Sequence, residues 1–235
     1  MTVIFYLLFG LVLVIFQPIQ WVCVNLFGFN AHEKSVTFLN FSIVICLRVL
    51  GTTFKLKAPE NLPKDAPILI VSNHQSLWDI PPIIWYLRQL RPKFVSKIEL
   101  GKGIPSVSYN LRQGGAALID RKNPRQALSE MIKFANFLNK DNRCGVIFPE
   151  GTRSKTGEPK RFQRKGLELL IKKMPDAYII PITINNSWKL QRYGMFPMPL
   201  GVCIKYDLHP ILKISDFEIE DLINTVESQI KSTIK

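Results

Sequence analysis

A histidine and an aspartate stand five residues apart in segment 73–79 (NHQSLWD), directly after the apolar run 68–71. An imidazole can take a proton from an alcohol, and a carboxylate bonded to one ring nitrogen fixes the tautomer and raises the basicity of the other. His74 and Asp79 are therefore a candidate general base and its orienting group. The structural alternative is a helix-capping box, in which Asp79 merely reaches back to the backbone of Ser76.

A second polar segment, 148–154 (FPEGTRS), also follows an apolar run. Arg153 offers a planar donor fork matched to phosphate, Thr152 and Ser154 add further donors, and Gly151 allows a sharp turn. An ordinary solvated turn is the alternative, since such residues are common in turns. Positive charge nevertheless continues along the loop, which favours a phosphate-binding role. These further basic residues are Lys155, Lys160, Arg161, Arg164 and Lys165.

Two further segments are less specific by themselves. Segment 97–105 (KIELGKGIP) has two glycines flanking Lys102 and is typical of a surface loop. In segment 180–184 (IPITI), Pro181 interrupts an apolar strand pattern. Because proline cannot donate to a strand ladder, the pattern predicts an edge strand or a bulge there.

The elements that must position these segments are short apolar runs alternating with helical patterns. This alternation predicts an α/β fold with a mixed, largely parallel central sheet flanked by helices, and open sheets of this kind bind ligands at their strand ends. A further alternating stretch, 52–57, is broken by 58–63. The predicted buried strands are 68–71, 94–95, 116–119, 145–148, 178–180 and 202–204, and the predicted helices are 76–90, 124–140, 162–174 and 215–233.

The N-terminal segment has the character of a membrane anchor. Residues 3–24 carry no charge, and as a helix they would measure about 33 Å against a hydrocarbon core of about 30 Å. Stretch 36–50 has one charged residue, so the two stretches predict a two-helix hairpin over 1–51, preceding an α/β domain over 52–235. A kink at Pro18 would favour a hairpin that dips into one leaflet over one that crosses.

Two alternatives to the anchor are weighed. A signal peptide would begin with basic residues and end in a small-residue cleavage site, and this chain has neither. An unusually apolar hairpin inside a soluble core is the other. Because basic residues follow the anchor, the positive-inside bias predicts that the remaining domain faces the cytoplasm.

The formal net charge of +13 suits anionic lipid headgroups, acidic carrier proteins or nucleotide phosphates. Nucleic acid is not expected as a partner, because no basic run with interleaved aromatics occurs. The four cysteines are far apart in sequence and form neither a zinc spacing nor a disulfide framework, which fits a reducing compartment.

Together, the four segments resemble the glycerolipid acyltransferase family, most closely its bacterial 1-acylglycerol-3-phosphate acyltransferases, over residues 56–206. The resemblance implies an acyl-CoA or acyl-carrier-protein donor, a lysophospholipid acceptor, a membrane surface as partner, no metal and no bound cofactor. Gly101-Lys102-Gly103 departs from the bulkier apolar residues expected there, which leaves the shape of the acceptor loop open. The resemblance makes His74 the catalytic base and Asp79 its orienter, Glu150, Gly151, Thr152 and Arg153 the glycerol phosphate site, Lys97 a second phosphate contact, and Pro181 a residue that shapes the acyl-donor region.

The expected reaction is therefore acylation of the sn-2 hydroxyl of 1-acylglycerol 3-phosphate to phosphatidic acid, on the cytoplasmic face of the inner membrane. Another lysolipid acceptor, such as a lyso-ornithine lipid, is an alternative that the sequence does not separate. A non-catalytic peripheral lipid-binding protein is the alternative from another class. The absence of a G-x-S-x-G motif argues against a serine-type lipid hydrolase, and no serine has an activating base, so direct transfer is expected.

Overall fold

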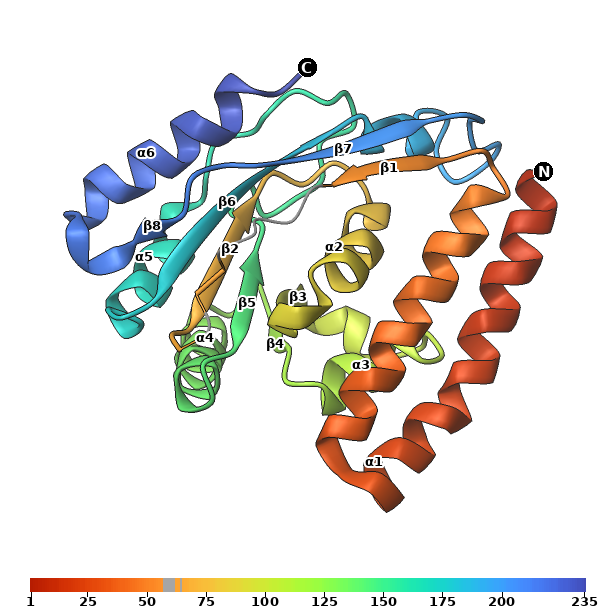
Figure 1. The fold of residues 1–235 in the computed structure, drawn as a ribbon, viewed down its shortest axis with the longest axis horizontal. Coiled ribbons are helices and arrows are strands. Elements are labelled where there is room, and N and C mark those ends of the chain that lie inside the picture. The colour runs from red at the N-terminus through yellow and green to blue at the C-terminus, as the bar shows by residue number, and fades with distance from the viewer. Residues whose placement is uncertain (57–61, 64) are drawn as a thin grey trace.

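One mixed sheet of eight strands forms the centre of the computed structural model, which describes residues 1–56, 62–63 and 65–235 (Figure 1). The strand order is β1-β7-β6-β2-β5-β3-β4, and β8 pairs with β6 beyond the end of β7. The predicted break over 58–63 falls largely outside the described residues. The strands are β1 Thr53–Leu56, β2 Ile68–Ser72, β3 Lys93–Lys97, β4 Ala117–Ile119, β5 Cys144–Ile147, β6 Tyr178–Asn185, β7 Cys203–Leu208 and β8 Leu212–Lys213.

The core of the sheet is parallel, as the sequence predicts. Strand β2 pairs in parallel with β5 on one side and β6 on the other, and β3 pairs in parallel with β5 and β4. Strands β7 and β8 pair antiparallel with β6, and β1, which pairs in parallel with β7, runs in the same direction as β7. All five residues of β2 are buried, which explains its continuous apolar sequence. The carboxyl ends of β2, β5, β3 and β4 therefore lie along one edge.

Helices cover both faces of the sheet. One face packs on α4 (Pro124–Lys140), α5 (Arg164–Lys173) and α6 (Ile219–Ser232), and the other on the N-terminal helices and α2 (Ile80–Tyr86). The predicted helix 124–140 is confirmed, whereas α3 (Val107–Gln113) and β8 were not predicted.

Two predicted helices are shorter in the structure. The predicted helix 76–90 is divided into α2 and flanking 3₁₀ turns at Leu77–Asp79 and Arg88–Leu90. The prolines after Ile80 explain the division, because they fit the first turn of a helix and not its interior. Likewise, α6 starts at Ile219, after a 3₁₀ turn, and not at 215.

Of the two predicted settings for Pro181, the edge is wrong, because β6 is an interior strand, and the bulge is confirmed, because residues 180–181 of β6 lie opposite three residues, 209–211. Residues 178–179 of β6 pair with β8, and residues 182–185 pair with β7, so Pro181 lies opposite the interruption between these two strands. Its carbonyl accepts from the His209 N–H on that side. Since the nitrogen and carbonyl of a strand residue face the same side, proline leaves out only the reciprocal bond to this residue, at the point where the pairing with β7 ends.

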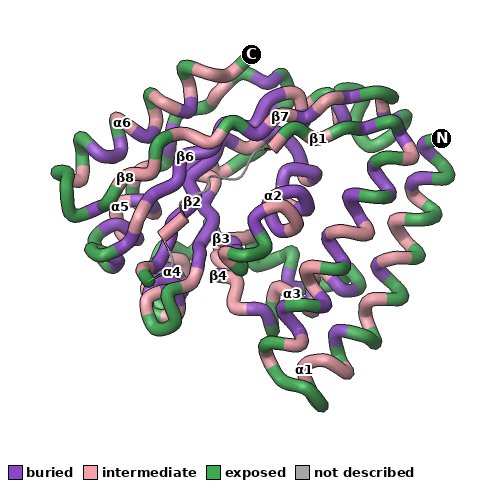
Figure 2. The backbone as a smooth tube through the Cα atoms, in the orientation of Figure 1, coloured by how far each residue is buried: buried purple, intermediate pink, exposed green. Residues whose placement is uncertain are grey.

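The N-terminal segment α1 (Thr2–Arg48) consists of two helical arms. The backbone leaves helical values at Gly28, with φ 78° and ψ −173°, and not at Pro18, which lies inside the first arm. The second arm packs beside α2, and the first arm lies outside it with exposed residues at many positions along its length (Figures 1 and 2). Only 17% of the most apolar stretch of α1 is buried, and α1 is long and apolar enough to cross a membrane. Its depth and the domain boundary at 51/52 stay predictions.

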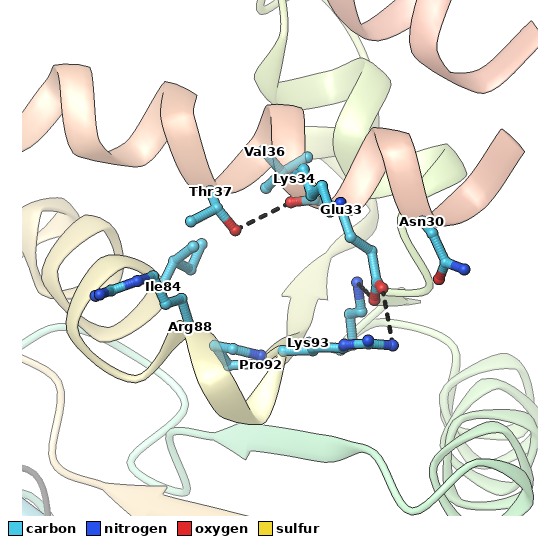
Figure 3. Close-up of a pocket in the computed structure, with 10 residues that line it drawn as sticks. Asn30, Glu33, Lys34, Val36, Thr37, Ile84, Arg88, Pro92 and Lys93 are labelled. Carbon is cyan, nitrogen blue, oxygen red and sulfur yellow. Dashed lines mark hydrogen bonds and ion pairs between the residues drawn. The ribbon is translucent and has the colours of Figure 1, made fainter. Parts of the chain in front are cut away.

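An ion cluster fixes the second arm to the sheet. Glu33 Oε1 accepts from Lys93 Nζ at 2.7 Å, and Arg91 lies 3.6 Å from Oε2 (Figure 3). Glu33 Oε1 also accepts from Arg143 Nη1 at 2.9 Å. A pocket of about 130 Å³ opens beside this cluster, between the arm and α2. Since Lys93 begins β3 and Arg143 precedes β5, the pocket lies at the opposite end of these strands from the polar segments. The pocket is therefore part of the contact region between the second arm and the sheet.

Candidate active site

Three of the predicted functional segments meet at the carboxyl edge of the sheet. Segment 73–79 follows β2, segment 148–154 follows β5, and Lys97 ends β3. These three strands are parallel neighbours, with β5 between β2 and β3. Residues far apart in sequence are thereby brought to one rim, as is typical for the ligand site of an open α/β sheet.

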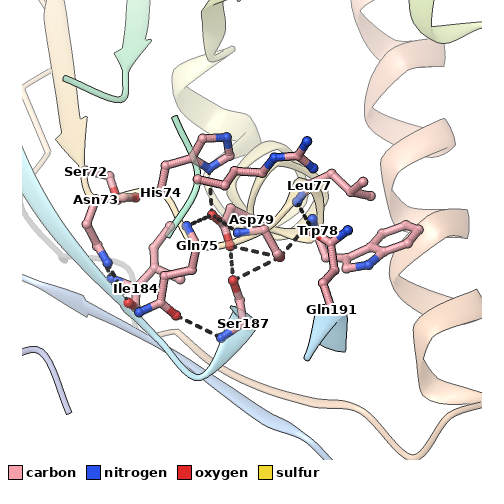
Figure 4. Close-up of polar contacts among 12 residues, drawn as sticks. Ser72, Asn73, His74, Gln75, Leu77, Trp78, Asp79, Ile184, Ser187 and Gln191 are labelled. Atoms are coloured by element: carbon pink, nitrogen blue, oxygen red, sulfur yellow. Dashed lines mark hydrogen bonds and ion pairs between the residues drawn. The ribbon is translucent and has the colours of Figure 1, made fainter. Parts of the chain in front are cut away.

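The His74 and Asp79 side chains are joined at this rim. His74 Nδ1 lies 2.8 Å from Asp79 Oδ2, and Asp79 is fully buried while 17% of the His74 side chain is exposed (Figure 4). Within the described part of the chain, the other ring nitrogen, Nε2, has no hydrogen-bond partner. The imidazole thus presents one nitrogen to its orienting carboxylate and keeps the second for a substrate.

The capping-box alternative is also correct, and it does not compete with the histidine contact. Asp79 Oδ2 accepts from the N–H groups of Gln75 at 2.8 Å and Ser76 at 3.0 Å, besides the His74 nitrogen. The Ser76 hydroxyl in turn accepts from the Trp78 N–H at 3.1 Å. The cap therefore holds the carboxylate in the position from which it orients the imidazole.

A residue remote in sequence supports the other carboxylate oxygen. The Ser187 hydroxyl donates to Asp79 Oδ1 and lies 3.0 Å from the Ser76 hydroxyl (Figure 4). The Ser187 N–H donates to Gln75 Oε1 at 3.0 Å. Ser187 begins a 3₁₀ turn that follows β6, so a third strand end contributes to the site.

The turn that carries His74 is fixed from two sides. The Asn73 amide donates to the Ile184 carbonyl at 2.8 Å and accepts from the Ile184 N–H at 2.7 Å, which continues the β2–β6 ladder by one side chain. From the β5 side, the Ser154 N–H donates to the His74 carbonyl at 2.7 Å, and Phe148 stacks on the imidazole with ring centroids 4.2 Å apart. The imidazole is thus held in place by neighbours on both adjacent strands.

Glu150 lies buried within the 148–154 loop. Burial raises its pKa to about 7, against the lowering effect of the backbone N–H groups of His74 and Lys160. Its Oε2 has no partner among the described residues. Gly151, the next residue, adopts φ 70°, which L side chains rarely do, so the sharp turn here requires glycine.

The basic residues of the rim are exposed. Arg153 and Lys97 both face solvent at the ends of neighbouring segments. The Lys160 ammonium donates to the Thr152 hydroxyl at 3.0 Å and to the Arg153 carbonyl at 2.8 Å, and so closes the loop on itself. The arrangement presents a guanidinium and two ammonium groups at one edge, a pattern suited to an anionic group.

The family model for acyltransferases matches residues 53–185 of this chain, which is more than half of its length. The chain belongs to this acyltransferase family. The match starts at β1 and ends with β6, so it includes the rim segments after β2, β3 and β5, whereas Ser187 follows it by two residues.

This acyltransferase is similar to named acyltransferases of several organisms. It is 26% identical to a 1-acyl-sn-glycerol-3-phosphate acyltransferase of Borreliella burgdorferi, over 83% of this chain and 77% of that one. It is 28% identical to an enzyme of the same name from Pseudomonas aeruginosa, over 88% and 80% of the two chains. The crystal structure of PlsC, a 1-acyl-sn-glycerophosphate acyltransferase from Thermotoga maritima, superposes with a TM-score of 0.77 at 25% identity, over 98% and 92%.

The predicted site residues of this acyltransferase divide into two groups by position. His74 and Asp79 are in contact, and Lys97, Glu150, Gly151, Thr152 and Arg153 follow the ends of neighbouring strands. Pro181 is buried within β6, beside Val71, below this edge. The predicted roles of these residues stay predictions. Among the described residues, no group of three or more His, Cys, Asp or Glu could hold a metal ion.

Proposed function

We propose that this acyltransferase moves a fatty acyl group from an acyl thioester to the sn-2 hydroxyl of 1-acylglycerol 3-phosphate, giving phosphatidic acid. The observation that carries the proposal is the imidazole of His74, which is oriented by a buried carboxylate and whose second nitrogen has no hydrogen-bond partner among the described residues. An alcohol attacks a thioester poorly unless its proton leaves during the attack, and this arrangement supplies the base.

In the proposed mechanism, the phosphate of the lysolipid binds Arg153 and Lys97, which directs its free hydroxyl to His74. As the oxygen attacks the thioester carbonyl, His74 Nε2 takes the hydroxyl proton and Asp79 stabilises the resulting imidazolium. The tetrahedral intermediate then collapses, the C–S bond breaks, and the imidazolium returns the proton to the leaving thiolate. The products are phosphatidic acid and a free thiol, and His74 is neutral again.

Direct transfer in a ternary complex is favoured over a covalent acyl-enzyme. The two serines beside the dyad, Ser76 and Ser187, are fully buried, and their hydroxyls are engaged with each other and with Asp79. Neither has a second base to activate it. Trapping of a labelled acyl-enzyme would contradict this part of the proposal.

The names of the relatives support the choice of acceptor, because the enzymes of Borreliella burgdorferi and Pseudomonas aeruginosa are called 1-acyl-sn-glycerol-3-phosphate acyltransferases. The exposed basic groups after β3 and β5 suit its phosphate. Acyl-CoA and acyl-carrier protein are both anionic, and the net charge of +13 suits either donor. We further propose that α1 holds the enzyme at the cytoplasmic face of the inner membrane.

The test is a turnover assay with lysophosphatidate and each donor, on the native chain and on His74→Ala. Loss of a general base is expected to lower turnover about 10²–10⁴-fold while folding is retained, because His74 is partly exposed. A His74→Ala enzyme with native turnover would refute the mechanism.

A second arm of the assay tests the acceptor. Arg153→Ala is compared with Lys155→Ala, an exposed cation in the same loop, on lysophosphatidate and on a lyso-ornithine lipid without phosphate. We expect Arg153→Ala to impair only the phosphate-bearing acceptor. An equal loss of activity on both acceptors would show that Arg153 does not act by binding the phosphate.

A further inference from the structure

The segment between β6 and β7 exposes a group of large apolar side chains. This segment, Arg192 to Leu200 and here named the 192–200 loop, lies beside the N-terminus of α1 (Figure 1). Four of its side chains are between 48% and 62% exposed. Exposure of so many large apolar side chains within one short loop is unfavourable in water, which indicates that this surface contacts a partner. These residues are Tyr193, Met195, Phe196 and Leu200.

The loop is tied to the first arm of α1, and the two form one surface. The Tyr6 hydroxyl donates to the Met195 carbonyl at 2.5 Å. The Thr2 hydroxyl accepts from the Met198 N–H at 3.1 Å. The adjoining arm also exposes large apolar residues towards solvent, and parts of both stretches are coloured as exposed in Figure 2. The exposed residues of the arm include Val3, Ile4, Leu7, Leu11, Val14 and Ile15.

The chemistry of the loop fits a bilayer interface better than a protein partner. Two cations lie at its N-terminal end, with Lys189 Nζ 5.9 Å from the Trp188 ring and the Arg192 guanidinium 5.8 Å from the Tyr193 ring. Aromatic rings combined with Lys and Arg beside apolar side chains are the composition that settles at the headgroup level of an anionic membrane. An acidic protein could bind the two cations, but it would not account for the uncharged, apolar first arm that continues the same surface.

The loop also connects to the catalytic dyad. Gln191, at its start, donates from Nε2 to Met195 Sδ at 3.1 Å and accepts from the Leu77 N–H at 3.2 Å, in the 3₁₀ turn that ends with Asp79. The same short segment begins with Ser187, whose hydroxyl donates to Asp79. Lipid contact through this loop would therefore take place close to the residues that orient His74.

We propose that the 192–200 loop inserts into the lipid interface beside the first arm of α1 and seats the site against the bilayer, so that the lysolipid enters from the membrane. This inference rests on the proposed function for its substrate, but membrane contact by the loop can be measured without turnover. The bilayer is the single occupant proposed for this surface.

Insertion depth is the first test, on the full-length protein bound to phosphatidylglycerol/phosphatidylethanolamine vesicles. Leu200→Trp is compared with Leu128→Trp, which places the same probe at a 51% exposed position on α4, on the other face of the sheet. Vesicles containing lipids brominated on the acyl chains should quench the added emission of Leu200→Trp and not that of Leu128→Trp. Equal quenching of the two variants would overturn the proposal.

Turnover separates this proposal from the proposed function. Tyr193→Ser/Leu200→Ser is expected to raise the apparent KM for vesicle-borne lysophosphatidate about tenfold, through lost apolar burial. It should leave turnover of a short-chain lysophosphatidate dissolved as monomers unchanged, and Leu128→Ser should change neither. A native KM on vesicles, an equal loss on the monomeric substrate, or a change confined to acyl-carrier-protein as donor would each overturn membrane docking. If the native chain turns over no lysophosphatidate in either form, the proposed function fails, while the quenching result stands independently.

Discussion

Replacing Asp79 by asparagine separates the charge of the orienting carboxylate from its hydrogen bonds. In the native chain, one oxygen of Asp79 faces three N–H donors, from His74, Gln75 and Ser76. The other oxygen faces the Ser187 hydroxyl, which can rotate to accept instead. An asparagine oriented with its oxygen towards the three N–H groups therefore satisfies every partner, and we expect Asp79→Asn to fold with nearly native stability.

Turnover of Asp79→Asn should nevertheless fall steeply. The negative charge that stabilises the imidazolium is lost, and two unit charges about 4 Å apart attract by about 4 kcal/mol at an effective dielectric constant of about 20. Because the neutral amide retains part of the interaction, we expect kcat to fall about 10²–10³-fold. Steady-state kinetics with lysophosphatidate and acyl-CoA, beside thermal unfolding of the same preparation, give both quantities.

Asp79→Ala serves as the control for the structural role of the same carboxylate. It leaves several buried donors without an acceptor, each at a cost of about 1–3 kcal/mol, so this variant should fold poorly or not at all. An Asp79→Asn enzyme with more than half of native turnover would refute the charge argument. An Asp79→Asn chain as unstable as Asp79→Ala would show that the asparagine cannot be accommodated as described.

Three further outcomes are expected. Arg153→Ala should raise the KM for lysophosphatidate about 10–100-fold with less change in kcat, as steady-state kinetics would show, since one charge-assisted contact is removed. Glu33→Gln leaves Lys93 and Arg143 without their buried carboxylate and should lower Tm by about 10 °C in a detergent-based unfolding assay. Glu150 has a folded-state pKa of about 7, above the unfolded value of 4.5, so the folded state binds more protons between these values and its stability falls as pH rises through them. Glu150→Gln should abolish this loss, about 2.5 kcal/mol between pH 5 and 8, in denaturant titrations at the two pH values.

Much of the fold was predictable because it depends on local patterns. The helix 124–140 was predicted at its observed ends, where Asn123 caps the first turn and Pro124 occupies a position that needs no N–H donor. The central strands were predicted because both of their faces are buried, so they are apolar throughout. By contrast, α3 has seven residues and β8 has two, too few for a periodicity to emerge.

The setting of Pro181 could be predicted only in part. A proline inside an apolar strand indicates an edge or a bulge, and the sequence does not decide between them. Here the neighbour on one side is divided into β7 and β8, and the interruption falls at this residue. That arrangement depends on residues 209–211, which carry no signal that would align them with Pro181.

The candidate site shows the same division between local and remote information. The pairing of His74 with Asp79 is encoded over five residues, because a strand end, a turn and a capped 3₁₀ start bring the carboxylate back to the imidazole. Sequence reasoning treated the cap and the orienting role of Asp79 as alternatives, whereas one oxygen performs both, and the backbone donors that define the cap restrict where the carboxylate can lie. Ser187, 108 residues away, was missed because its contact exists only once β6 has paired with β2. A short motif of this kind is therefore detectable in a sequence because its precision comes from backbone hydrogen bonds within the motif, while the residues that support it from other strands are left unidentified.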